Sequence, residues 1–91
     1  MPYHYVYVLR SGEDGTNYVG CTNNLKRRLD EHSSGKSFST RNKRPLQLIY
    51  SEIYLNQQDA FTREKFLKSG WGKNYIRRIL QNWFRSKNLG G

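Results

Sequence analysis

The sequence is poor in the residues that build disulfide-linked, thiolate-ligated and membrane-embedded proteins. Among its 91 residues Cys21 is the only cysteine, which excludes a disulfide scaffold and a metal cage of several thiolates. No apolar stretch approaches the roughly 20 residues that cross a bilayer. The first residues lack a basic stretch followed by an apolar run, so we expect no signal peptide and a cytoplasmic location.

Phosphate-binding loops and multi-ligand metal sites are also missing. The chain has no glycine-rich loop of the nucleotide-binding types. Its two histidines cannot build a histidine-rich zinc site, and most of its seven acidic residues fall on expected turns or exposed helix faces. A two-metal centre needs several converging carboxylates, so we do not expect one.

Positive charge, by contrast, is abundant. Sixteen lysines and arginines stand against seven acidic residues, which gives a net charge of +9. This excess suits a polyanion, and nucleic acid is the usual one. The cations are spread along the chain rather than gathered in one run, which disfavours a membrane surface as the partner. A basic protein that is merely soluble remains the alternative.

Three segments have the composition and alternation of β-strands. They are rich in aromatic and β-branched residues and cover residues 3–10, 17–21 and 46–54. The turn residues at 11–16 predict that the first two strands pair as an antiparallel hairpin, which brings Tyr7 and Tyr18 onto one sheet. We expect a bulge or strand end at 51–52.

Three helices are predicted from caps and apolar spacing. The first begins near Leu25 after the cap residues 22–24 and stops at 33–35. The second begins at Asn56 or Asp59 and ends near Lys68, after which Ser69, Gly70, Trp71 and Gly72 break the helix. The expected buried faces consist of Ala60, Phe61 and Leu67 in the second helix, and of Ile76, Ile79, Leu80 and Trp83 in a third helix capped by Asn74. The fold class is therefore α+β, with a small, largely antiparallel sheet, helices packed on it and the order β-β-α-β-α-α. Residues 1–85 form one domain, and residues 86–91 are expected to be a disordered tail.

Glu64 is the most informative acidic residue. It lies within the apolar stripe of the second helix, where an ionised carboxylate is costly unless it is paired or bound to a cation. Two interpretations stay open. Glu64 could form a structural ion pair with an arginine, or it could be the ligand of a single Mg²⁺ or Mn²⁺ ion, with water and phosphate completing the coordination shell of the ion.

Tyr7, Tyr18, Arg28 and His32 form a second group of candidates. Strand tyrosines usually serve packing, but Arg28 and His32 share or border the inward helix face of Leu25. A guanidinium there stays charged and must find an anion, either a scissile phosphate or Glu64.

The residues quoted above resemble a known signature. Tyr5-Val6-Tyr7, then Tyr18-Val19-Gly20 with Tyr18 eleven residues after Tyr7, is similar to the GIY-YIG nuclease signature. Arg28 follows ten residues after Tyr18 and His32 four residues later, and the stretch TREKFLK carries Glu64. The resemblance spans about residues 3–84 and is to small stand-alone bacterial members. The chain departs from it at Tyr5 and Val6, which replace glycine and isoleucine, and an asparagine that some relatives carry near the end of the domain has no clear match.

The resemblance implies a three-stranded antiparallel sheet flanked by helices and an endonuclease that hydrolyses DNA with one divalent metal. By position, Tyr7 would orient or deprotonate the attacking water with Tyr18 beside it, and Arg28 would stabilise charge in the transition state. His32 would support the site or assist proton transfer, and Glu64 would hold the metal, Mg²⁺ or Mn²⁺.

We expect this domain to hold its own substrate, DNA more than RNA, as a monomer or weak dimer. The cations expected to contact phosphates are Lys36, Arg41, Lys43, Arg44, Arg63, Lys73 and Arg77. Phe38 and Trp71 could stack on bases, although Trp71 could equally fill the core. Nothing resembles a base-reading helix, so we expect little sequence specificity and a steep salt dependence. A non-catalytic nucleic-acid-binding module, and a nuclease subunit that needs a partner, remain as alternatives.

Overall fold

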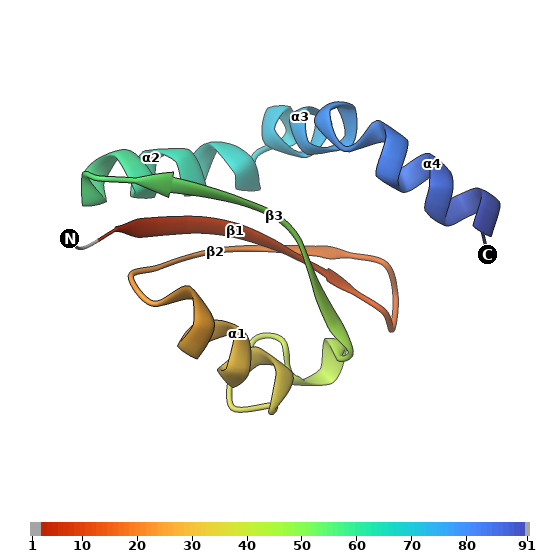
Figure 1. Cartoon of the computed structure of the whole chain (residues 1–91), viewed down its shortest axis with the longest axis horizontal. Helices are drawn as coiled ribbons and strands as arrows, with labels where there is room; N and C mark the ends of the chain where they lie inside the picture. Colours follow the sequence, from red (N-terminus) through yellow and green to blue (C-terminus); the bar gives the residue numbers. More distant parts are fainter. Residues whose placement is uncertain (1–2, 91) are drawn as a thin grey trace.

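A three-stranded antiparallel sheet is the centre of the molecule. The computed structural model describes residues 3–90, with the side chains of residues 3–87. β1 (His4–Ser11) lies between β2 (Asn17–Thr22) and β3 (Leu46–Tyr54), in the order β2-β1-β3 (Figure 1). Both pairings are antiparallel, as predicted. β2 is therefore an edge strand, and among residues 3–90 no further strand pairs with its outer side in this sheet.

The irregularity in the sheet lies elsewhere than the sequence predicted. Val8 pairs with Tyr50 and Leu9 pairs with Leu48, so Ile49 is the extra residue of a bulge. Residues 51–52, where a bulge or strand end was expected, pair regularly with β1. That prediction was wrong, because the small and polar pair at 51–52 imitates a strand end while β3 continues to Tyr54.

The helices cover both faces of the sheet. α1 (Leu25–Ser33) lies on one face, and α2 (Gln57–Lys68) and α3 (Gly70–Ile79) lie on the other, while α4 (Gln81–Gly90) continues beyond α3 (Figure 1). The caps are the predicted ones for the first two helices: Asn24 accepts from the N–H of Arg27, and Asn56 accepts from two N–H groups of the first turn of α2. Among the described residues, no helix is long and apolar enough to cross a membrane.

The third predicted helix differs from the observed one. Ser69 rather than Asn74 is the N-cap of α3, and its Oγ accepts from the N–H of Gly72 at 3.2 Å. The segment 70–72, expected to break the chain, is the first turn of α3. Gly72 permits this because a Cβ there would lie 2.1 Å from the carbonyl oxygen of Phe66. α3 can thus begin directly against the end of α2.

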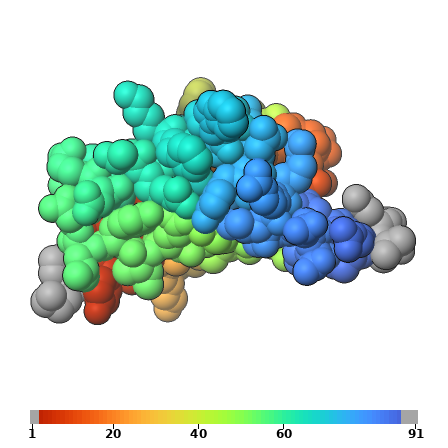
Figure 2. All heavy atoms as spheres, turned by 90° about the horizontal axis from the view of Figure 1, so that it is seen from above, coloured from red at the N-terminus to blue at the C-terminus, as the bar shows by residue number. Residues whose placement is uncertain are grey.

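The described residues contain one α-helix more than predicted, besides a short 3-10 helix at Arg41–Lys43. Leu80 leaves the helical conformation and separates α3 from α4, so the observed order is β-β-α-β-α-α-α. α4 extends through Gly90, whereas a disordered tail was expected from Ser86 onward; Gly91 lies outside the described residues. Seen from above the view of Figure 1, α2, α3 and α4 follow one another along the molecule (Figure 2).

The hydrophobic core lies between the sheet and α2–α3. Strand alternation turns Val6 and Val8 to this face and Tyr7 and Leu9 to the face of α1. The buried core residues are Val6, Val8, Val19, Ala60, Leu67 and Ile76. Phe61 and Ile79 were expected in the core but are 44% and 40% exposed. Phe61 follows Ala60 directly, so it points about a quarter turn away from the buried stripe.

Candidate active site

Tyr7 is placed over the edge strand because its neighbour on β2 is a glycine. Tyr7 pairs with Gly20, and a Cβ on Gly20 would lie 2.3 Å from the Tyr7 hydroxyl oxygen and 2.4 Å from Cζ. The phenol ring therefore occupies the space that any other residue at position 20 would fill. Tyr7 is only 1% exposed, so its hydroxyl needs a hydrogen-bond partner within the protein.

That partner is His32 of α1. The Tyr7 hydroxyl lies 2.9 Å from Nε2 of His32, and Nδ1 of His32 lies 2.6 Å from Oγ1 of Thr40. His32 and Thr40 are each 1% exposed, so the three side chains form a buried chain of hydrogen bonds. Tyr18 completes the group, with its ring 5.3 Å from the His32 ring in an edge-on arrangement.

The protonation of this chain follows from burial. Burial raises the pKa of the Tyr7 hydroxyl above its usual 10.0, and the Arg28 guanidinium opposes the rise only in part. Burial, reinforced by the charge of Arg28, lowers the pKa of His32 below its usual 6.5. At neutral pH the phenol is protonated and the imidazole is neutral. The Tyr7 hydroxyl thus donates to Nε2, and Nδ1–H donates to Thr40.

Arg28 lies beside the two phenols and is held by an acidic neighbour. Its Nη1 is 2.9 Å from Oε1 of Glu31, and its Nη2 is 3.4 Å from Oγ of Ser37. Pairing with Glu31 raises the pKa of Arg28, and the hydroxyls of Tyr7 and Tyr18 add to this against the effect of burial. The anion that the sequence required for Arg28 is therefore Glu31 in this state, and not Glu64.

Glu64 approaches the same region from the opposite face of the sheet. Its Oε2 is 3.1 Å from Nζ of Lys68, one turn along α2, so its partner is a lysine rather than the arginine considered above. The Glu64 charge helps to raise the pKa of Cys21 on β2 and, as the smallest contribution, that of Tyr7. The carboxylate thus lies near the β2 edge over which the Tyr7 ring passes.

The donors present fit a hard divalent cation with few protein ligands. Among residues 3–90, no group of three or more His, Cys, Asp or Glu side chains is placed to hold a metal. Mg²⁺ typically keeps several waters and binds through one or two carboxylates and a phosphate. Glu64 suits that mode: its side chain is 22% exposed and already holds a cation, the Lys68 ammonium. The residues do not suit a zinc site of nitrogen and sulfur ligands.

The predicted phosphate-contacting cations do not form one patch. The segment after α1 lies on the α1 side of the sheet, whereas α2 and α3 lie on the other (Figure 1). The first group comprises Lys36, Arg41, Lys43 and Arg44, and the second comprises Arg63, Lys73 and Arg77. Two members have acidic partners: Lys43 pairs with Asp14, and Arg63 makes two hydrogen bonds to Glu52 at 2.9 and 3.0 Å. Their contact with nucleic acid stays a prediction.

The two aromatic residues proposed for stacking are both exposed. Phe38 is 80% exposed, and the Arg41 guanidinium lies 4.6 Å above its ring. Trp71 is 79% exposed, so the interpretation that it fills the core was wrong. Trp71 belongs to the first turn of α3 and not to a loop between two packed helices, which explains the difference.

Some residues of the site escaped sequence analysis. Glu31 and Lys68 had a detectable signal, because each lies three or four residues from an opposite charge on a helix. Thr40 and Ser37 had none, because the loop after α1 brings them back to the site without any periodic pattern.

Three comparisons with known proteins identify what this chain is similar to. Residues 3–76 match the GIY-YIG catalytic domain. A UPF0213 protein of Bacillus pumilus is 42% identical over 67 residues, covering 72% of this chain and 67% of the relative. One from Pediococcus pentosaceus is 38% identical over 86 residues, covering 93% and 90%. The solution NMR structure of a UPF0213 protein from Bacillus halodurans superposes with a TM-score of 0.55 at 31% identity, covering 85% and 84% of the two chains. The names of these relatives state no activity.

Proposed function

Because the chain belongs to the GIY-YIG nuclease domain family, we propose that it is a metal-dependent endonuclease that hydrolyses phosphodiester bonds of DNA. The observation that carries the proposal is the buried chain from Tyr7 through His32 to Thr40, with the Arg28 guanidinium beside it. A phenol with a neutral imidazole behind it can pass on a proton, and a guanidinium suits a phosphate.

The proton path follows from the hydrogen bonds. With its pKa raised by burial, Tyr7 first orients an attacking water. It can take the water's proton only as its own proton passes to Nε2 of His32, whose lowered pKa leaves that nitrogen free to accept. Thr40 accepts from Nδ1–H and so holds the imidazole in the required tautomer.

Charge on the phosphate is met by the two remaining residues. Arg28 exchanges its partly exposed partner Glu31 for a phosphate oxygen and stabilises the negative charge that develops there. Glu64 would hold the divalent metal, Mg²⁺ or Mn²⁺, which when bound neutralises charge on the reacting phosphate and the leaving oxygen. Little sequence specificity is part of the proposal, because the expected contacts are lysines and arginines on phosphates, and phosphate contacts carry no sequence information.

A cleavage panel tests the proposal. Labelled linear, forked, junction and single-stranded DNA are incubated with Mg²⁺, with Mn²⁺ and with chelator. We expect single-turnover rates to fall about 10²–10³-fold in Arg28→Ala and Glu64→Ala, less in Tyr18→Phe, and not in the exposed control Lys26→Ala. Equal rates in all four variants would defeat the assignment of the site.

The panel also separates the alternatives. Tight DNA binding without cleavage under any divalent ion would favour a non-catalytic nucleic-acid-binding module. Cleavage that appears only after a cell extract is added would favour a subunit that needs a partner.

A further inference from the structure

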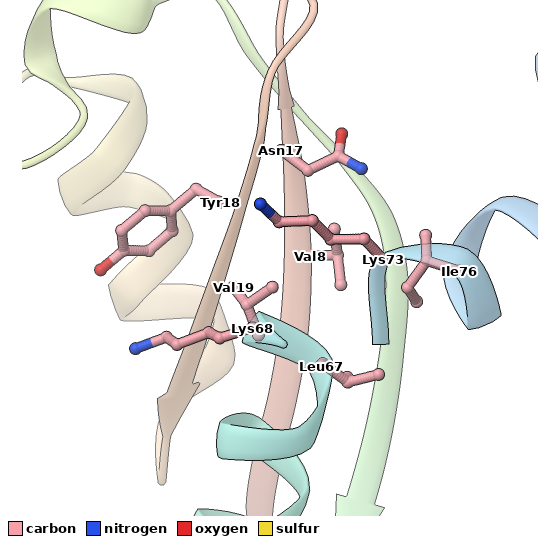
Figure 3. Close-up of a pocket in the computed structure, with 8 residues that line it drawn as sticks. All are labelled: Val8, Asn17, Tyr18, Val19, Leu67, Lys68, Lys73 and Ile76. Atoms are coloured by element: carbon pink, nitrogen blue, oxygen red, sulfur yellow. The ribbon is translucent and has the colours of Figure 1, made fainter. Parts of the chain in front are cut away.

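A pocket opens beside the candidate active site, on the α2–α3 side of β2. Its volume is about 210 Å³, and its floor consists of core side chains that are almost fully buried: Val8, Val19, Leu67 and Ile76. Polar residues surround it: Asn17, Tyr18, Lys68 and Lys73. Figure 3 shows Tyr18 and Lys68 extending past the same side of β2, while Asn17 and Lys73 lie at the other end of the pocket. Tyr18 is thus shared between the pocket and the candidate active site.

The pocket continues into a second hollow along α3. This hollow has a volume of about 530 Å³ and shares Asn17 and Lys73 with the pocket. It adds Arg10 of β1, Arg77 of α3 and the ring of Phe84. We call the two together the α3 groove, which runs from Tyr18 to Phe84.

The α3 groove is positively charged with little to neutralise it. Lys73 and Arg77 are exposed and lie one helical turn apart, about 5–6 Å between their Cβ atoms. Within the part of the chain that the structure describes, Arg10, Lys73 and Arg77 form no ion pair. Residues 65–91 contain seven lysines and arginines and no acidic residue. A row of free cations beside an apolar pocket is complementary to a strand whose phosphates and bases alternate.

We infer that the α3 groove binds a single polynucleotide strand, with one unpaired base in the apolar pocket and phosphates on Lys73, Arg77 and Arg10. The pocket is smaller than the 300–1,000 Å³ typical of drug-sized ligands, so it suits one ring system. A base within a duplex would have to leave its stack to enter, whereas an unpaired base enters freely. This inference rests on the proposed function and names its substrate class: a phosphodiester next to an unpaired nucleotide.

Binding without divalent metal tests the inference apart from cleavage. Fluorescence anisotropy is measured in chelator with 12-mers of deoxyuridine and of uridine, with an abasic 12-mer of the deoxyribose–phosphate backbone, and with a duplex containing a labelled 12-mer. We expect the wild type to bind the strand with bases at least about fivefold tighter than the abasic strand, and tighter than the duplex. The better of the two sugars then identifies the nucleic acid.

A charge-matched pair of variants locates the site. Lys73→Ala/Arg77→Ala removes two cations from the α3 groove, and Lys26→Ala/Arg27→Ala removes two exposed cations from α1. Two lost phosphate contacts lower the salt slope by about 1.4, so the wild-type-to-variant affinity ratio is about sevenfold larger at 50 mM than at 200 mM salt. The α1 control should keep the wild-type slope.

Two results would overturn the inference: equal affinity for abasic and normal strands, or the same salt slope in the two double variants. Either result together with metal-dependent cleavage by the wild type would leave the proposed nuclease activity standing. Groove binding as expected, but without cleavage of any substrate, would remove the activity and keep the groove.

Discussion

Gly20→Ala is the sharpest test of how the site is assembled. The new Cβ would lie 2.3 Å from the Tyr7 hydroxyl oxygen, 2.4 Å from Cζ and 2.9 Å from Cε1. An exposed ring could swing away at little cost. Tyr7 cannot, because it is 1% exposed and its hydroxyl is hydrogen-bonded to His32. The clash must therefore move the ring, the strand or both.

The cost has two parts. Overpacking a well-filled site costs about 1–3 kcal/mol, and losing the hydrogen bond from Tyr7 to His32 costs about 1 kcal/mol more. We expect the free energy of unfolding to fall by about 2–4 kcal/mol, which lowers the Tm of a domain of this size by at least about 8 °C. Cleavage should fall as well, because a displaced Tyr7 no longer donates to Nε2.

Urea and thermal unfolding followed by circular dichroism measure the stability, and single-turnover cleavage measures the chemistry. Gly70→Ala is the matched control, since a Cβ there meets nothing within 4 Å and alanine is the better helix former. It should leave both measurements unchanged or raise stability slightly. If Gly20→Ala unfolds and cleaves like the wild type, the argument that glycine makes room for Tyr7 is refuted.

Two further predictions concern charge. The pKa of His32 is lowered in the folded protein, so its neutral form contributes stability that is complete above about pH 6.5 and is lost as the pH falls through the folded-state pKa. The urea midpoint of the wild type should therefore decline on the acid side. His32→Asn should remove this part of the decline. If Glu64 binds the metal, Lys68 competes with it, so Lys68→Ala should lower the Mg²⁺ concentration for half-maximal cleavage about twofold while Lys65→Ala leaves it unchanged. A raised Mg²⁺ requirement in Lys68→Ala would contradict this.

The sheet could be predicted well from the sequence because the signals of its strands are local. Aromatic and β-branched runs defined the three strands, and turn residues at 11–16 fixed the hairpin. The end of the chain was harder, because Gly70 and Gly72 indicate a break by propensity, whereas both lie in the first turn of α3 and Gly72 permits its close contact with the end of α2. Tertiary packing overrode propensity there, as it also did at Leu80, where the apolar spacing continued through an interrupted helix.

The candidate site residues were named from the sequence, but the contacts between them were not. The structure joins Tyr7 to His32 directly and places Tyr18 and Arg28 beside them. The predicted hairpin accounts only for Tyr7 and Tyr18 lying on one sheet. Partners across long sequence distances were out of reach: Thr40 comes from an irregular loop, and Arg10 meets α3 and α4 only through the fold. Sequence spacing also could not decide whether Glu64 and Arg28 pair with each other or within their own helices. In the structure each pairs within its own helix, Glu64 with Lys68 and Arg28 with Glu31.

The position of β2 at the edge of the sheet explains how residues from both faces can meet. If β2 were a central strand, the strands on both sides of it would keep side chains on the α1 face apart from side chains on the α2 face. At an edge, Gly20 lets the Tyr7 ring pass over the strand, while Glu64 and Lys68 approach from α2. Cys21 is the next residue of β2, and its pKa is raised by the charge of Glu64 and lowered by that of Lys68, in addition to the larger effect of burial. The edge of β2 is therefore part of the candidate site, and a partner strand that paired with β2 would cover this edge.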